Sequence, residues 1–292
     1  MRAVVFGGSG FLGSHVADAL SNAGYKVKIF DLKRSIYLRP DQEMVIGDIL
    51  NYDEVLDVVS RNDNIYNFAG IADLDDATTK PIETIRLNVE GTVNILEACR
   101  LKNVRRFVYA STIYVYSNKG GFYRCSKQAS ELYIEEFHKR YGLDYTILRY
   151  GTLYGPRADK RNSIYSYLYQ ALEEKKIVCS GTGEEIREYI HVRDAARLSV
   201  QILSESFSNK YVILAGHHPM KFASLLHMIK EIMDNSIEIQ FKNKPNADHY
   251  NITPYTYIPK IGSKLTLNQY IDLGQGLLEC LHYISNSETE KE

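Results

Sequence analysis

The stretch "VVFGGSGFLGSH", residues 4–15, decides the fold. A short apolar, β-branched run leads into Gly7, Gly10 and Gly13, and apolar residues at helical spacing follow over residues 11–24. Glycines between a strand and a helix allow a tight turn, a close approach of the backbone to a pyrophosphate, and close packing of the helix on the strand. The N-terminus of that helix stabilises the negative charge of the phosphates. Because a strand and a helix flank the glycines, the stretch predicts a dinucleotide site rather than a tight turn alone.

Strand-like and helix-like segments alternate through the first half of the chain. Beyond the first strand and helix, strands are predicted at 26–30, 43–47, 64–70, 105–111 and 144–150, and helices at 52–60, 82–102 and 123–142. Alternation of this kind implies right-handed crossovers between parallel strands. The predicted fold class is therefore α/β, a doubly wound, mostly parallel sheet of the Rossmann type.

The pattern loosens after about residue 155. Helices are predicted at 163–176, 192–205, 222–234 and 267–284, and strands at 211–216 and 237–241. We expect residues 1–155 to form the cofactor-binding Rossmann domain and residues 156–284 to form mainly a smaller C-terminal α/β substrate lobe. Residues 285–292 are expected to be a frayed polar tail. The lobe would lie over the carboxyl edge of the sheet, where ligands of open α/β sheets bind.

The composition argues against several classes of protein. The 292 residues carry a formal net charge of −1, so we expect no nucleic-acid partner and no anionic membrane. The four cysteines are scattered without metal-ligand spacing, so we expect reduced thiols and no metal site. No apolar run is long enough to span a bilayer, and the N-terminus enters a strand without a signal peptide. A cytoplasmic protein is the expectation.

Asp31 ends the second predicted strand, 24 residues after Gly7. A carboxylate at this point accepts hydrogen bonds from both ribose hydroxyls of NAD and repels the 2′-phosphate of NADP. Lys33 and Arg34 follow closely, and they are either a solvated pair of charges or compensation for such a phosphate. The sequence favours NAD, with NADP as the alternative.

A second stretch, "STIYVYSNKGGFYRCSK" at residues 111–127, holds Thr112, Tyr123 and Lys127. A tyrosine and a lysine four positions apart share one face of a helix. Free tyrosine has a pKa of about 10, too high for a good base at neutral pH, and a neighbouring cation lowers it. The pair is either catalytic or an ordinary helix surface in a chain with 23 tyrosines.

Taken in order, the motifs resemble those of the extended short-chain dehydrogenase/reductase family, especially its NAD-dependent nucleotide-sugar epimerase/dehydratase branch. Besides the two stretches above, the resemblance rests on "GDI" at 47–49, "NFAG" at 67–70, "NVEGT" at 88–92, "LRYGTLYGPR" at 148–157 and "REYIHVRDAA" at 187–196. It runs from Met1 to about Ala196 and continues weakly into residues 259–277. The order of so many motifs carries the resemblance more than any one of them.

The resemblance implies a role for individual residues. NAD would be bound by Gly7, Gly10, Phe11, Leu12, Asp31, Asp48, Ile49, Ala69 and Lys127. The catalytic residues would be Thr112, Tyr123 and Lys127. A nucleotide-diphosphate sugar would be bound by Thr112, Tyr123, Thr152 and Arg187. Asn88 is expected to bond backbone near the cofactor.

The chemistry of the family implies that Tyr123 removes a proton from a sugar hydroxyl while hydride leaves the same carbon for NAD. Thr112 would orient the reacting oxygen. Lys127 would hold the ribose of the cofactor and lower the pKa of the tyrosine. We therefore expect an NAD-dependent oxidoreductase or epimerase of carbohydrate biosynthesis that oxidises a sugar hydroxyl to a ketone, with C4 as the favoured position.

Departures from the family pattern narrow the reaction. The 4,6-dehydratases of the family carry an Asp-Glu pair where this chain has Ile113 and Tyr114, so we expect a 4-epimerase or 4-dehydrogenase and not a 4,6-dehydratase. The segment at 117–121 is short, which opens the pocket or suits an unusual sugar, and Thr152 replaces an asparagine that relatives place near the substrate phosphates. A nucleotide-4-keto-sugar reductase and a non-catalytic NAD-sensing binding protein are the alternatives.

Several side chains also have a plain structural interpretation. Arg187 either binds a diphosphate or pairs with a nearby glutamate, and Tyr114 and Tyr116 either touch the sugar or fill the pocket wall. Packing is the expectation for His191, Tyr165, Tyr167 and Tyr169.

A homodimer is also expected from the resemblance. Relatives pair the long helix at about 82–102 with the helix that carries Tyr123. Leu132 and Ile134 are apolar positions on that second helix besides its catalytic face.

Overall fold

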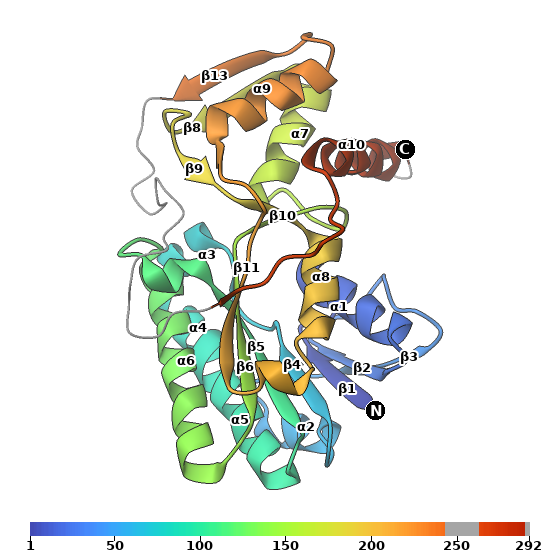
Figure 1. Cartoon of the computed structure of the whole chain (residues 1–292), viewed down its shortest axis with the longest axis vertical. Coiled ribbons are helices and arrows are strands. Elements are labelled where there is room, and N and C mark those ends of the chain that lie inside the picture. The colour runs from blue at the N-terminus through green and yellow to red at the C-terminus, as the bar shows by residue number, and fades with distance from the viewer. Residues whose placement is uncertain (243–262, 290–292) are drawn as a thin grey trace.

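The centre of the molecule is a sheet of eight strands in which every neighbouring pair is parallel (Figure 1). The structure is a computed structural model that describes residues 1–242 and 263–289. The strands run in the order β14-β11-β6-β5-β4-β1-β2-β3. Their bounds are β1 Arg2–Phe6, β2 Lys26–Asp31, β3 Gln42–Ile46, β4 Asn64–Asn67, β5 Arg106–Thr112, β6 Tyr145–Tyr150, β11 Lys210–Leu214 and β14 Ser263–Lys264. The order reverses between β1 and β4, and this is the point at which sheets of the predicted class bind ligands.

Helices cover both faces of the sheet. Alternate residues of each strand point to opposite sides, and the apolar side chains on both sides need to be buried. Val5 belongs to an apolar core shared with one helical layer, whereas Val4 and Phe6 belong to a second core under the other layer. The first layer consists of α1 Phe11–Asn22 and α8 Val192–Gln201. The second consists of α2 Tyr52–Val58, α3 Leu74–Thr79, α4 Pro81–Ile85, α5 Gly91–Lys102 and α6 Gly121–Tyr141. The doubly wound α/β prediction is confirmed.

The long helix predicted at 82–102 is interrupted by one π-helical turn, Arg86–Glu90, between α4 and α5. Asn88 lies in this turn, and its side chain accepts a hydrogen bond from the backbone N of Ile71 at 2.7 Å and donates to the carbonyl O of Ile71 at 2.9 Å. Its amide also donates to Ser126 Oγ at 2.9 Å. Asn88 therefore fastens the loop after β4 to α6, in agreement with the structural role that the sequence indicates.

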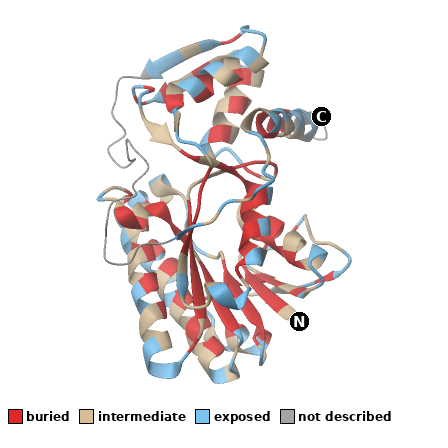
Figure 2. Ribbon diagram, viewed as in Figure 1, coloured by how far each residue is buried: buried red, intermediate tan, exposed pale blue. Residues whose placement is uncertain are grey.

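A smaller lobe with its own apolar core stands at the carboxyl ends of the strands (Figures 1 and 2). Its elements are β7 Thr152–Tyr154, α7 Ser163–Glu173, β8 Lys176–Ser180, β9 Ile186–Arg187, β10 Tyr189–His191, β12 Met220–Lys221, α9 Phe222–Ile232, β13 Glu238–Lys242 and α10 Leu273–Thr289. Tyr165, Tyr167 and Tyr169 of α7 pack against that core, as predicted. Three elements of residues 156–284 return to the sheet: α8 packs on α1, β11 pairs with β6, and β14 pairs with β11. The predicted boundary near residue 155 thus separates sheet and lobe only in part.

The C-terminal helix differs from its prediction at both ends. It begins at Leu273 rather than at residue 267, because Asp272 Oδ1 accepts hydrogen bonds from the backbone N of Gly274 and Gln275, at 2.9 and 3.3 Å, as a helix cap does. The segment before it runs beside the sheet instead, where Leu265 N bonds the carbonyl O of Ile213 at 3.0 Å. α10 continues to Thr289, within the segment 285–292 for which the sequence predicts a frayed polar tail.

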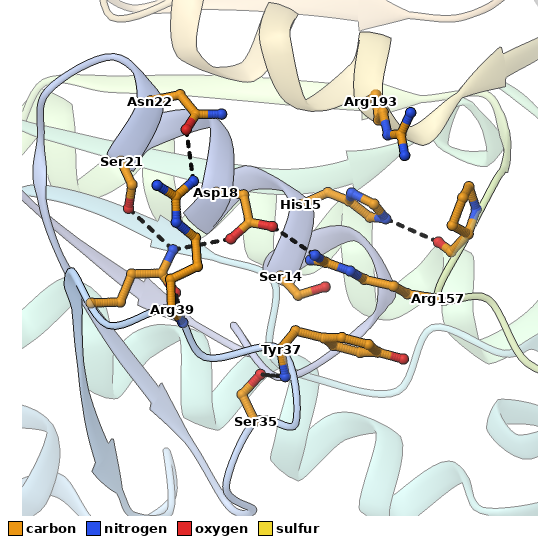
Figure 3. A network of polar contacts seen from close by, with 12 residues as sticks. Ser14, His15, Asp18, Ser21, Asn22, Ser35, Tyr37, Arg39, Arg157 and Arg193 are labelled. Carbon is orange, nitrogen blue, oxygen red and sulfur yellow. Dashed lines mark hydrogen bonds and ion pairs between the residues drawn. The ribbon is translucent and has the colours of Figure 1, made fainter. Parts of the chain in front are cut away.

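Polar contacts fasten the lobe to α1 on one side of the molecule (Figure 3). His15 Nε2 lies 2.9 Å from the carbonyl O of Pro156, and Arg157 Nη2 lies 2.7 Å from Asp18 Oδ2. The Arg157 guanidinium also covers the ring of Tyr37 at 4.4 Å, and the hydroxyl of Tyr37 lies 3.1 Å from that of Tyr283 in α10. These contacts tie α1 to the start of the lobe, and they tie the loop after β2 to α10.

His15 predicts an acid-sensitive stability. Burial lowers the pKa of His15 to about 4 in the folded protein. The imidazole therefore becomes protonated near pH 6.5 in the unfolded chain but only near pH 4 in the folded chain. The stabilisation is present above pH 6.5 and is lost as the pH falls towards 4, at up to about 1.4 kcal/mol per pH unit. Urea unfolding of His15→Gln between pH 7 and 4.5 should show a shallower loss than the intact protein. The exposed His227→Gln is the control, and equal slopes for all three proteins would contradict the prediction.

Candidate active site

A cavity of about 230 Å³ opens where the strand order reverses, between β1 and β4. Its walls are Gly7, Gly10, Phe30, Asp31, Leu32, Gly47, Ile49, Phe68, Ala69, Gly70 and Leu87. Gly7 has φ of +77°, and a Cβ there would lie 2.5 Å from the backbone N of Ala69. A Cβ on Gly13 would lie 2.2 Å from the carbonyl O of Gly7. The turn can therefore be built only from glycine at these two positions.

The predicted ribose-binding carboxylate lies at the rim of this cavity. Asp31 Oδ2 accepts a hydrogen bond from the backbone N of Ser9 at 2.9 Å, which ties the end of β2 to the glycine turn. Lys33 and Arg34 are exposed, as a solvated pair would be. Phe11 and Leu12 begin α1 at the same turn.

Asp48, a predicted cofactor-binding residue, does not line the cavity. Gly47 and Ile49 line the cavity, but Asp48 does not, and its Oδ1 accepts a hydrogen bond from the backbone N of Leu50 at 2.9 Å. Contact between Asp48 and an adenine stays a prediction. The Cβ-free turn, the anchored Asp31 and the cavity between them nevertheless fit a dinucleotide, and they would hold NAD by its pyrophosphate and its adenosine ribose.

Thr112, Tyr123 and Lys127 come together at the carboxyl end of β5. Thr112 is the last residue of the strand, Tyr123 lies in the first turn of α6, and Lys127 lies one turn later. All three side chains are buried, with exposed fractions of 5%, 9% and 6%. The structure therefore brings together the three residues that the sequence predicts to be catalytic, and an exposed helix surface is the wrong interpretation of the Tyr-Lys pair.

Lys127 points back into the sheet rather than towards solvent. Its Nζ donates to the carbonyl O of Ala110 at 2.8 Å and lies 4.8 Å from the ring centroid of Tyr109 and 5.7 Å from that of Tyr123. Burial lowers the pKa of Lys127 to about 8, and the carboxylate of Glu131 acts in the opposite direction. The ammonium stays largely protonated at neutral pH and places a positive charge beside Tyr123.

The pKa of Tyr123 lies above its ordinary value. Burial raises it to about 12, and a hydrogen bond with Thr112 lowers it only in part. A buried phenolate loses its hydration, and this loss outweighs the effect of a lysine that is directed at a backbone carbonyl. That Lys127 and a bound nicotinamide together lower the pKa of Tyr123 stays a prediction.

A buried ion pair that the sequence analysis missed lies behind the three residues. Arg149 Nη2 and Nε lie 2.6 and 3.0 Å from the two carboxylate oxygens of Glu131, and Ser111 Oγ donates to Glu131 at 2.5 Å. Arg149 also donates to the hydroxyl of Tyr116 at 2.5 Å. Tyr116 is buried and supports this ion pair, and contact between Tyr116 and a sugar stays a prediction. Two signals were available: Glu131 stands one helical turn after Lys127, and Arg149 interrupts an apolar strand.

The two residues predicted only for the substrate lie on lobe strands. Thr152 begins β7, directly after β6, and Arg187 lies on β9. The glutamates near Arg187 in the sequence make contacts of their own: Glu184 with Lys221 at 2.7 Å, Glu188 with Lys264 at 2.7 Å, and Glu185 with the backbone N of Thr182 at 2.9 Å. Roles for Thr152 and Arg187 in substrate binding stay predictions.

The short segment at 117–121 is held in place by hydrogen bonds. Arg124 Nη1 donates to the carbonyl O of Ser117 at 3.0 Å, and Ser117 Oγ accepts from the backbone N of Lys119 at 2.9 Å. The segment therefore closes tightly between β5 and α6.

His191 packs, as predicted, and has no catalytic geometry. Its ring lies edge-on to Tyr154, with centroids 5.2 Å apart, and its Nε2 lies 3.4 Å from Glu279 of α10. Burial lowers the pKa of His191 to about 4. Among the described residues, no cluster of three or more His, Cys, Asp and Glu side chains could hold a metal ion. Within the same residues, none of the helices has the length and apolar character needed to cross a bilayer.

Comparison with known proteins agrees with this geometry. Residues 3–215 match the sequence profile of the "NAD dependent epimerase/dehydratase family". The chain is 26% identical over 306 residues to a protein of Methanocaldococcus jannaschii named "Putative UDP-glucose 4-epimerase", covering 97% of this chain and 98% of that one. It is 25% identical to the dTDP-glucose 4,6-dehydratase of Mycolicibacterium smegmatis, covering 99% and 95%. UDP-glucuronic acid decarboxylase 1 of Xenopus tropicalis matches at the same 25%, covering 97% and 72%.

A solved structure shares the fold over nearly the whole chain. The crystal structure of UDP-glucose 4-epimerase with UDP-glucose from Thermotoga maritima superposes with a TM-score of 0.84. The match covers 99% of this chain and 100% of the other at 23% identity. The superposition supports the Rossmann-type architecture. An identity of 23% says nothing about the substrate of this chain.

Two glycine substitutions should separate the contribution of the turn to stability from its contribution to NAD binding. Gly13→Ala places a Cβ against the backbone, so the free energy of unfolding should fall by about 1–3 kcal/mol and NAD binding should fall with it. At Gly10 a Cβ would lie 3.4 Å from its nearest neighbour, so Gly10→Ala should leave stability within about 0.5 kcal/mol. It narrows the cavity, however, and should weaken NAD binding about tenfold or more in calorimetric titration. Equal effects of the two variants on stability would contradict this assignment.

Proposed function

Because the chain belongs to the NAD-dependent epimerase/dehydratase family, we propose that it oxidises one hydroxyl of a nucleotide-activated sugar, that at C4, as a 4-epimerase or a 4-dehydrogenase. The observation that carries the proposal is the convergence of buried Thr112, Tyr123 and Lys127 at the strand edge that also bears the NAD cavity. NAD, when bound, supplies a hydride acceptor and a positive charge on its nicotinamide.

The residues have distinct tasks in this proposal. Tyr123 takes the proton of the sugar hydroxyl, and Thr112 holds the reacting oxygen by a hydrogen bond. Lys127 binds the ribose hydroxyls of the cofactor and contributes one of the charges that favour phenolate. Thr152 and Arg187, on β7 and β9, are proposed to contact the diphosphate of the substrate, and a planar guanidinium suits that task.

The charges around Tyr123 support this assignment of roles. Lys127 and Arg149 are buried cations, and Glu131 is a buried carboxylate that pairs with Arg149. The Lys127 ammonium lies 5.7 Å from the ring centroid of Tyr123, and a cation near a phenol favours its ionised form. A positively charged cofactor would add to this effect, so the base is expected to become active in the loaded enzyme.

An epimerase or dehydrogenase accounts for the site better than a dehydratase. Elimination of water needs an acid and a base beside the reacting carbons. Ile113 is fully buried among apolar residues, and Tyr114 turns its ring towards Tyr123. A nucleotide-4-keto-sugar reductase would use the same three residues in the opposite direction. A protein that only senses NAD would have no need to bury a lysine beside a tyrosine.

Substitutions at the three residues test the proposal. Tyr123→Phe removes the phenolic oxygen and keeps the ring, so NAD should still bind while turnover falls by ~10²–10⁴-fold. Lys127→Met should weaken NAD binding as well as turnover. Turnover is followed by chromatographic separation of C4 epimers together with product mass, on a panel of UDP-glucose, UDP-N-acetylglucosamine, UDP-glucuronic acid and dTDP-glucose. Tyr169→Phe, in the lobe, is the control, and a Tyr123→Phe variant with near-normal turnover would end the catalytic interpretation.

We also propose the homodimer that the resemblance implies. Ile82 and Ile85 on α4 and Leu132 on α6 are exposed by 76%, 58% and 61%, and a second copy would cover such apolar residues. Ile134, the other apolar position expected at this interface, instead lies in the core at 0% exposure, so that part of the prediction is wrong.

Charge placed on these helices should separate the two copies. Sedimentation of the intact protein at micromolar concentration should give a dimer, and Ile85→Glu with Leu132→Glu should give a folded monomer. Leu278→Glu, on the exposed side of α10, is the control and should remain dimeric. A monomeric intact protein would contradict the proposal.

A further inference from the structure

Tyr114 stands between the two halves of the proposed catalytic group. Its backbone N donates to Thr112 Oγ1 at 3.2 Å, and its ring meets that of Tyr123 edge-on, with centroids 6.4 Å apart and planes at 77°. The ring is half-buried, in a short 3₁₀ turn that connects β5 to the segment before α6. One residue therefore contacts both the hydroxyl that would orient the substrate and the phenol that would take its proton.

The segment at 117–121 is shaped to accept this ring. Gly120 has φ of +91°, and a Cβ there would lie 2.7 Å from Cδ1 and 3.1 Å from Cγ of Tyr114. Both the left-handed backbone and the close approach exclude a side chain at this position. The tether from Arg124 to Ser117 then holds the segment against the ring. A short loop with glycine at 120 and an aromatic residue at 114 are thus parts of one arrangement.

The first turn of α6 needs support of this kind. Gly120 is the residue that precedes the helix, and it offers no side chain to cap the first backbone N–H groups. Tyr123 lies in that uncapped turn, only two residues after the helix begins. Its ring contact with Tyr114 fixes the direction of a phenol that would otherwise depend on a helix end prone to fraying.

We propose that Tyr114 is a positioning residue, which holds the phenol of Tyr123 in line with Thr112 through a ring seated on Gly120. The inference rests on the proposed role of Tyr123, and it assigns to Tyr114 and the short loop together the support of the catalytic tyrosine. An error of about 1 Å in the place of a reacting group can cost ~10²-fold in rate, so such support matters for turnover more than for stability.

The test uses the full chain with NAD added and two readouts. The first is turnover on the nucleotide-sugar panel named above, divided into kcat and KM. The second does not need a substrate: 3-fluorotyrosine is incorporated at position 123, and the line width and shift of its fluorine resonance report the order of the ring. Tyr114→Phe keeps the ring and should preserve both readouts. Tyr114→Leu should lower kcat by about 10–100-fold and leave the KM for the nucleotide sugar unchanged. It should also broaden or split the fluorine resonance.

Glycine variants supply the matched control. Gly120→Ala should reproduce the effect of Tyr114→Leu, because the added Cβ displaces the ring, and the double variant should lose little more than either single one. Gly142 ends the same helix with φ of +70° and has no atom within 4 Å of an added Cβ. Gly142→Ala therefore imposes similar backbone strain and should leave kcat and the resonance unchanged.

The outcomes separate the two proposals. A resonance that is unaltered in both Tyr114→Leu and Gly120→Ala overturns the positioning role, whatever the turnover. A disturbed resonance in a protein that converts no sugar of the panel keeps the positioning role and counts against the proposed function. Equal losses in Gly120→Ala and Gly142→Ala would also overturn it, since backbone strain alone would then explain them.

Discussion

The structure depends on the place where α1 crosses the end of β1 so closely that no side chain fits between them. A Cβ on Gly13 would overlap the carbonyl of Gly7, and one on Gly7 would overlap the backbone after β4. This contact brings the start of α1 against the point where the strand order reverses and leaves the cavity that Asp31 borders. It also places α1 where α8 and the lobe pack on it. Removing the glycines would therefore disturb the cofactor cavity and the attachment of the lobe together.

Electrostatics set the second constraint. Burial raises the pKa of Tyr123 to about 12 and lowers that of Lys127 to about 8. The interior thus disfavours both the phenolate of Tyr123 and the ammonium of Lys127. Arg149 and Glu131 form the charged support behind them. Burial favours the neutral form of the phenol, and further positive charge beside it would favour the phenolate. Under the proposed function the cofactor would supply that charge, so proton removal would be tied to cofactor binding.

The sequence predicted the parts of the molecule that follow from local periodicity. The strand–helix alternation of the first 150 residues, the glycine turn and the Thr-Tyr-Lys group all have signals within a short window. Strands of two or three residues, such as β9 and β14, have no period to detect, because their partners lie far along the chain. The pairing of Glu131 with Arg149, the burial of Ile134 and the ring contact of Tyr114 depend likewise on tertiary packing. At the start of α10 the sequence did contain a signal, because Asp272 is a residue type that caps helices. The apolar pattern before it nevertheless led to a predicted start at residue 267.

The central claim is that the buried Thr-Tyr-Lys group oxidises a nucleotide sugar at C4 with NAD. The most direct measurement incubates the purified protein and NAD with nucleotide sugars that carry deuterium at C4, and follows the absorbance of reduced nicotinamide, the chromatographic separation of C4 epimers and the product mass. The account predicts that deuterium leaves C4 for the nicotinamide. An epimerase would return it to C4 of a product of unchanged mass, and a dehydrogenase would release a ketone with stoichiometric reduction of NAD. Loss of water or of carbon dioxide from the sugar would contradict the 4-epimerase or 4-dehydrogenase assignment, and NAD binding without any transfer of deuterium would contradict the enzymatic account itself.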